Sequence, residues 1–100
     1  GPVPHLKMLL AYVTARLRAP WCRSLKDKRS LGKGLMEKLR RQFNVTVAES
    51  GLQDTHTLLE LGIAALAFDS AQADSILENL YAFLEGATDA EIVHWETEYR

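Results

Sequence analysis

The order in which two hydrophobic periodicities alternate along this chain is the feature that most constrains its fold. Four segments alternate at period two, which is typical of β-strands, and two segments between them carry apolar residues at helical spacing. The predicted strands cover residues 6–17, 44–50, 57–68 and 90–99, and the predicted helices cover about 25–43 and 71–85. Short, right-handed connections between elements in this β-α-β-β-α-β order predict an α+β, ferredoxin-like fold. In that fold a four-stranded antiparallel sheet carries both helices on one face.

The ends of the two predicted helices carry their own signals. Ser24 is an N-cap residue with Asp27 three positions later, so we expect the first helix to begin at residue 25. Ser70 is the expected N-cap of the second helix and Gly86 its expected stop. The segment 57–68 also admits a helix because of its length and Gly62, but the turn and the β-branched segment before it favour a strand.

The length and the cysteine usage of the chain restrict its organisation. One hundred residues suffice for a single domain, which we place at residues 3–100, and Gly1 and Pro2 are interpreted as the remnant of a cleaved expression tag. No apolar run reaches the roughly 18 residues of a transmembrane helix, so we expect no contact with a membrane. The single cysteine, Cys22, excludes an internal disulfide and favours a cytoplasmic location.

The net charge of −1 conceals a strong separation of charge along the chain. Residues 1–41 hold 11 Lys or Arg and 2 Asp or Glu, whereas residues 42–100 hold 1 and 11. The cations crowd the first helix and oppose its dipole at the N-terminus, so helix stability alone does not account for them. We expect them, with the free N–H groups at the helix start, to bind RNA phosphates. The predicted phosphate-binding residues are Arg23, Lys26, Lys28, Arg29, Lys33, Arg40 and Arg41.

Other roles for the basic segment remain open. A solvated surface is the commoner role of a charged helix face, and the acidic half of the same chain or of another copy is an alternative partner. Within the helix, four cations fall on one arc at 100° per residue, namely Lys26, Arg29, Lys33 and Arg40. Arg16 and Arg18 are expected to join Arg23 and Lys28 near the helix start.

The face of the sheet that the helices leave uncovered is expected to be apolar. It would carry Met8, Leu10, Tyr12, Leu58, Ala64, Leu66 and Phe68. An exposed apolar face of this kind marks a surface for dimerisation or docking. The predicted interface residues are Met8, Leu10, Tyr12, Leu66 and Phe68. If the two faces of the sheet are reversed, these residues belong instead to the core.

No catalytic, cofactor or metal motif is found. His5, His56 and His94 lie far apart without metal-ligand spacing, and no phosphate-binding glycine loop is present. Cys22 stands beside Arg23, which is expected to lower its pKa. We therefore expect a protein that is not an enzyme and has no cofactor. An enzyme for small anions that uses Cys22 or His56 is the least favoured alternative.

Several runs of residues together resemble the YlxP-like family, a bacterial family of unknown function. They are Arg23–Arg29 (RSLKDKR), Leu39–Glu49 (LRRQFNVTVAE) and Gln53-Asp54, and the resemblance extends over nearly the whole chain from about Leu6. It implies a ferredoxin-like fold and a cytoplasmic protein, often encoded beside translation and ribosome-maturation factors. This sequence departs from the family pattern at Thr55-His56-Thr57.

These observations lead to two expectations for function. The first is a non-enzymatic accessory protein that binds RNA, with ribosomal RNA or the small ribosomal subunit as the implied partner, through its basic first helix. The alternative is a homodimeric protein-interaction module that uses the open apolar sheet face and binds no nucleic acid.

Overall fold

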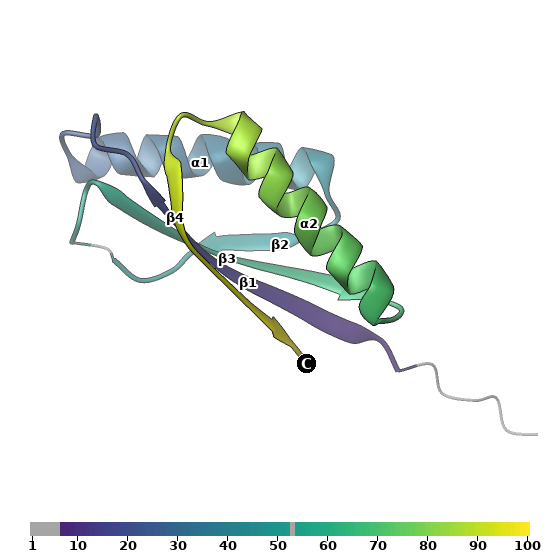
Figure 1. Cartoon of the computed structure of the whole chain (residues 1–100). Helices are drawn as coiled ribbons and strands as arrows, with labels where there is room; N and C mark the ends of the chain where they lie inside the picture. Colours follow the sequence, from purple (N-terminus) through teal and green to yellow (C-terminus); the bar gives the residue numbers. More distant parts are fainter. Residues whose placement is uncertain (1–6, 53) are drawn as a thin grey trace, which may run out of the picture.

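The computed structural model describes residues 7–52 and 54–100 and contains the predicted order of elements (Figure 1). The elements are β1 (Leu9–Arg18), α1 (Leu25–Gln42), β2 (Thr46–Glu49), β3 (Leu58–Ala67), α2 (Ser70–Ala87) and β4 (Glu91–Tyr99). The segment 57–68 is therefore a strand, as favoured. Gly1, Pro2 and the predicted strand start at Leu6 lie outside the described residues.

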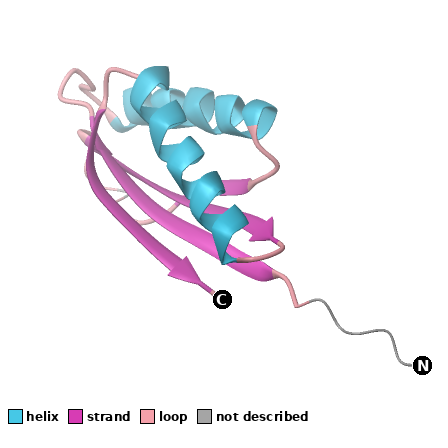
Figure 2. Cartoon of the chain, turned by 45° about the vertical axis from the view of Figure 1, so that its right-hand side comes forward, coloured by secondary structure: helices cyan, strands magenta, loops and turns pink. Residues whose placement is uncertain are grey.

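The four strands form one antiparallel sheet with the order β2-β3-β1-β4. Both helices cover the same face of this sheet (Figure 2). The helix α1 packs on β2 and β3, whereas α2 packs on β1 and β3. The short strand β2 and the strand β4 therefore form the two edges, with α1 near the β2 edge. The ferredoxin-like α+β fold is confirmed.

The core lies between the sheet and the two helices. Every second residue of β1 and β3 points into it, and the helices contribute apolar residues at helical spacing. These residues include Ala11, Val13, Ala15 and Leu17 of β1, Leu59, Leu61 and Ile63 of β3, Leu35 and Leu39 of α1, and Ala73, Leu77, Leu80 and Leu84 of α2. Gly32 lets α1 approach β3, because a Cβ there would lie 3.3 Å from a methyl group of Leu59.

The opposite face of the sheet is open, with the register that the alternation predicts. Leu10 pairs with Leu66 and Tyr12 pairs with Ala64 across β1 and β3. The Tyr12 ring lies over Gly62, where a Cβ would come within 2.5 Å of the tyrosine hydroxyl. Only one end of this face is apolar, since Arg16, Glu60 and His94 occupy the neighbouring rows, and Leu58 lies at the far end opposite Arg18.

Two local predictions about element ends are wrong. The N-cap of α2 is Asp69, whose carboxylate accepts from the Gln72 amide, and not the adjacent Ser70. Gly86 does not stop α2, which continues to Ala87. Ile92 packs against the core, because a register shift in β4 opposite Arg16 and Leu17 turns it to the face that Trp95 also occupies.

Candidate nucleic-acid interface

The start of α1 is capped by the chain itself. The Ser24 hydroxyl accepts a hydrogen bond from the Asp27 amide at 3.1 Å, as the spacing predicts. The Asp27 carboxylate in turn accepts from the Arg23 amide at 2.9 Å. An acidic side chain thus occupies the first turn, where its charge complements the helix dipole. Asp27 places a negative charge at this helix start, which disfavours the predicted binding of phosphate there.

Four exposed cations form a row along α1, which we call the basic stripe: Lys26, Arg29, Lys33 and Arg40. The row faces the β2 side of the helix, since the Arg40 guanidinium donates to the Val47 carbonyl of β2 at 3.0 Å. On the other flank, Lys38 donates to the Ala87 carbonyl at the end of α2. At 1.5 Å per residue the stripe is about 21 Å long.

Lys28 does not belong to this surface. Its side chain is 2% exposed, and its ammonium donates to the carbonyls of Leu52 at 2.6 Å and Thr55 at 2.5 Å. The Glu49 carboxylate lies 3.9 Å away. The ammonium therefore ties α1 to the loop between β2 and β3, where Gly51 and Leu52 both have left-handed backbones. The prediction that Lys28 contacts phosphate is wrong.

No cation of the basic stripe has an acidic partner within 4.0 Å in the described part of the chain. Arg23 and Arg41 are also exposed and lack such a partner among these residues. The carboxylates of the second half lie largely elsewhere, because α2 and β4 contain six of them and no Lys or Arg. The acids of α2 and β4 do not form ion pairs with the stripe.

Arg16 and Arg18 do not extend the basic surface. Arg16 pairs with Glu60 of β3 at 2.8 Å, and Arg18 pairs with Glu91 of β4 at 2.6 Å. The hydrogen bond from Arg16 holds the pKa of Glu60 below its usual value, and a second hydrogen bond from the Ser50 hydroxyl acts in the same direction. Both arginines therefore form ion pairs between strands of the sheet, unlike the unpaired cations of the basic stripe.

The five predicted interface residues lie at one end of the molecule and are all at least partly exposed. Leu66 is 63% and Phe68 is 68% exposed, and Met8 is close to half exposed. Leu10 and Tyr12 are half-buried beside them on β1. We call Met8, Leu10, Tyr12, Leu66 and Phe68 the apolar patch. The possibility that these residues belong to the core is thereby removed.

The two reactive groups considered from the sequence, Cys22 and His56, differ in their exposure to solvent. Cys22 is buried, and burial raises the pKa of its thiol, with a smaller contribution in the same direction from Asp27 that Lys28 opposes. The expectation that Arg23 lowers this pKa is wrong. His56 is exposed in a loop. Among the described residues, no three His, Cys, Asp or Glu side chains gather as a metal site, and neither helix is long and apolar enough to cross a bilayer.

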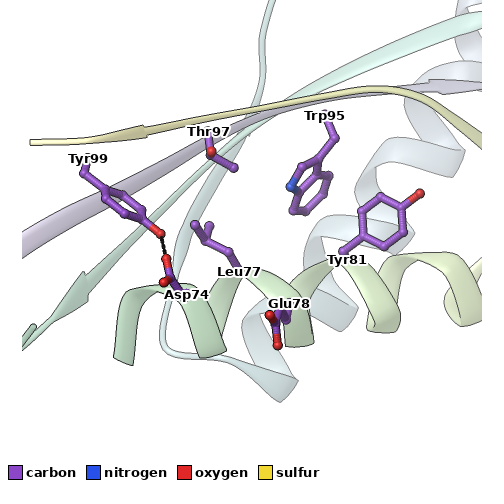
Figure 3. Close-up of a pocket in the computed structure, with 7 residues that line it drawn as sticks. All are labelled: Asp74, Leu77, Glu78, Tyr81, Trp95, Thr97 and Tyr99. Carbon is purple, nitrogen blue, oxygen red and sulfur yellow. Dashed lines mark hydrogen bonds between the residues drawn. The ribbon is translucent and has the colours of Figure 1, made fainter. Parts of the chain in front are cut away.

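Sequence reasoning missed a groove between α2 and β4. It has a volume of about 530 Å³ and is lined by seven residues: Asp74, Leu77, Glu78, Tyr81, Trp95, Thr97 and Tyr99 (Figure 3). Two periodicities contained the signal, since positions 74, 77, 78 and 81 share one helix face and positions 95, 97 and 99 share one strand face. The sequence prediction used both sets of residues only to define a helix and a strand.

Comparison with known proteins finds a sequence family and a relative that match this chain. Residues 10–97 match the family described as "Protein of unknown function (DUF503)". The chain is also 33% identical over 76 residues to the "Uncharacterized protein YlxP" of Bacillus subtilis (strain 168), an alignment that covers 76% of this chain and 83% of that protein.

Proposed function

Because the chain belongs to the DUF503 family of proteins of unknown function, the YlxP-like family that its motifs resemble, we propose its function from its own surface. The basic stripe binds the phosphate backbone of RNA, and the protein acts as a non-enzymatic accessory factor. One observation carries this proposal: four cations lie in a row on one helix, exposed and without an acidic partner among the described residues. Phosphate contacts of this kind supply most of the non-specific affinity for nucleic acid.

The placement of the other charges supports RNA over the acidic half of the same chain as the partner. The acids of α2 and β4 lie on elements that face the opposite edge of the sheet from β2. Their repulsion of phosphate orients an approaching strand toward α1. The resemblance to the YlxP-like family suggests that the RNA is ribosomal and that the protein acts in the cytoplasm.

The proposal is tested by titrating a labelled single-stranded RNA oligonucleotide at several salt concentrations. Four phosphate contacts predict a log–log slope of affinity against salt of about −3, since each contact contributes about −0.7. We expect the triple variant Lys26→Gln/Arg29→Gln/Lys33→Gln to reduce the size of this slope by about 2. Arg40 is left in place because it also holds the Val47 carbonyl.

A matched variant distinguishes the effect of the basic stripe on RNA affinity from the effect of net charge. Lys7→Gln/Lys38→Gln/Arg100→Gln removes the same charge from exposed positions outside the stripe. This variant is expected to keep most of the slope of RNA affinity against salt concentration. Equal loss in both variants, or binding by the stripe variant like that of the unmodified protein, contradicts the proposal. Co-sedimentation with ribosomal particles at low and high salt then tests the ribosomal partner.

The exposure of the apolar patch favours a second candidate function. Leu66 and Phe68 are the most exposed large apolar side chains described, and they line one hollow with Met8, which directly precedes β1. The strand β2 pairs only with Leu61–Ala64 of β3, so the end of β3 that bears Leu66 has no partner on that side within the described residues. We propose that this end of the sheet forms a homodimer, which is compatible with RNA binding through α1.

A further inference from the structure

The groove between α2 and β4 combines carboxylates with aromatic rings. Its α2 wall carries Asp74 and Glu78, and its β4 wall carries Trp95 and Tyr99 (Figure 3). The groove exists because β4 is an edge strand, while α2 packs on β1 and β3. The side chains that β4 turns toward the helix are therefore covered on one side only. Its volume of about 530 Å³ lies within the range of small-ligand sites.

The charge of this groove is negative and is not balanced within the described structure. Asp74 and Glu78 are exposed, and neither has a Lys, Arg or His partner within 4.0 Å among the described residues. The hydroxyl of Tyr99 donates to the Asp74 carboxylate, and this bond raises the pKa of Tyr99. Tyr99 is an uncharged hydrogen-bond donor, so it orients the Asp74 carboxylate without pairing its negative charge with a positive one.

The aromatic rings add a preference for a flat cation. Tyr81 and Trp95 meet edge to face, with ring centroids 5.0 Å apart and an interplanar angle of 85°. Trp95 projects from β4 toward α2, and Tyr81 lies beside it on the helix (Figure 3). Aromatic faces attract cations, and a guanidinium can stack on a ring while its fork of N–H donors pairs with a carboxylate. The ammonium of a lysine has no planar group that could stack on a ring in this way.

We propose that the groove binds the guanidinium of an arginine in an exposed basic segment of a partner protein. The carboxylate of Glu78 pairs with its N–H groups, and the ring of Trp95 accepts its planar face. Tyr81 packs edge to face against Trp95 and holds that ring in place, and Asp74 adds negative charge at the other end of the groove. Charge complementarity selects this occupant, because the same carboxylates repel nucleic acid. This site is independent of the proposed RNA contact, since the basic stripe lies on a different helix.

A second copy of this chain is a less suitable occupant than a separate protein. Arg18 and Arg100 already pair with Glu91 and Glu98. The exposed arginines without an acidic partner among the described residues lie on or beside α1, so docking them in the groove uses the basic surface of each molecule. Such a contact joins two different surfaces and therefore propagates into open-ended chains unless it closes as a ring. A basic segment of another protein can fill the groove without occupying the basic stripe and without linking molecules into open-ended chains.

The test uses the fluorescence of Trp95. The variant Trp21→Phe leaves Trp95 as the only tryptophan of the chain, because the sequence contains two. This protein is titrated with a short peptide of alternating glycine and arginine, and with matched peptides in which lysine or the neutral residue citrulline replaces arginine. We expect a saturable change in Trp95 fluorescence that is strongest for arginine, weaker for lysine and absent for citrulline.

Two substitutions on α2 then distinguish the effect of the groove on peptide affinity from the effect of net charge. Glu78→Gln is expected to weaken arginine-peptide binding about tenfold, the loss of one charge-assisted hydrogen bond. Glu85→Gln makes the same charge change on the same helix outside the groove and is expected to leave the affinity within about twofold. Far-UV circular dichroism of each variant checks that the fold is intact.

Three outcomes of the peptide titrations overturn the proposal. The first is no saturable signal with the arginine peptide, and the second is equal affinity for the citrulline peptide. The third is an equal loss of affinity in the Glu78 and Glu85 variants. Self-association without any peptide, abolished by Glu78→Gln, assigns the groove to a second copy and also overturns the separate partner. Failure of RNA binding leaves all of these outcomes unchanged.

Discussion

A single lysine shows how residue type alone misleads about a binding surface. Lys28 lies among seven other cations between Arg23 and Arg41, yet its ammonium is buried and bound to two loop carbonyls. Burial of a charged group is tolerated when it is hydrogen-bonded, and the nearby Glu49 carboxylate adds a favourable charge. The charge of Lys28 therefore stabilises the fold, whereas its neighbours Lys26 and Arg29 face the solvent.

Replacing Lys28 by methionine is expected to lower the free energy of unfolding by about 2 kcal/mol, because the carbonyls of Leu52 and Thr55 lose a charged donor. Urea denaturation measures the change. Lys26→Met, at an exposed position of the same helix, serves as the control and is expected to change the stability by less than about 0.5 kcal/mol. Equal changes in the free energy of unfolding for the two substitutions would show that the buried hydrogen bonds of Lys28 do not stabilise the fold.

At the scale of elements, the ion pair of Arg16 and Glu60 joins the two central strands on the open face. Because this contact lowers the pKa of Glu60 in the folded protein, the carboxylate contributes stability above its ordinary pKa near 4.5. That contribution is lost as the pH falls through the lowered folded-state value. We expect unmodified protein to exceed Glu60→Gln in stability at pH 7.

The pH dependence distinguishes an ionic contribution of Glu60 from a packing effect. The difference in unfolding free energy between the two proteins, measured by urea denaturation, is expected to shrink as the pH is lowered from 5 toward 3. Glu85→Gln on α2, an exposed carboxylate with no ion-pair partner among the described residues, is the matched control. A difference that stays constant over this range contradicts the ionic role of Glu60.

The elements were more predictable from the sequence than the site. Periodicity, with the turn before residues 57–68, identifies the six elements and the open face, because burial of one face repeats along each strand, as at Ala11, Val13 and Ala15. It cannot choose between Asp69 and Ser70, two adjacent residues that both suit an N-cap. It also cannot reveal the burial of Lys28 or the ion pair of Arg16, since both depend on contacts between distant parts of the chain.

At the scale of the whole molecule, the fold turns a separation of charge along the chain into a separation in space. The basic stripe lies on α1 near β2, and the acids of α2 and β4 lie toward the other edge of the sheet. The apolar patch occupies a third place, at one end of β1 and β3. Three surfaces of different chemistry are thus arranged around one small core.

The proposed dimer is tested at this scale by light scattering at micromolar concentration. We expect about twice the 11.2 kDa of one chain, and we expect Leu66→Glu to give monomers, because a charge cannot be buried in an apolar contact. Val93→Glu places the same charge at another exposed apolar position, on β4, and is expected to leave the dimer intact. A monomer in the unmodified protein contradicts dimerisation through the patch.

The opposite placement of α1 and the α2–β4 edge also changes what the isoelectric point means for this protein. A value near 6.3 predicts weak retention on either kind of ion-exchange resin at neutral pH. A resin, however, meets one edge of the molecule at a time, and each edge carries an excess of charge of one sign. At low ionic strength we therefore expect both cation and anion exchangers to retain the protein, because its retention follows the arrangement of its charges and not their sum.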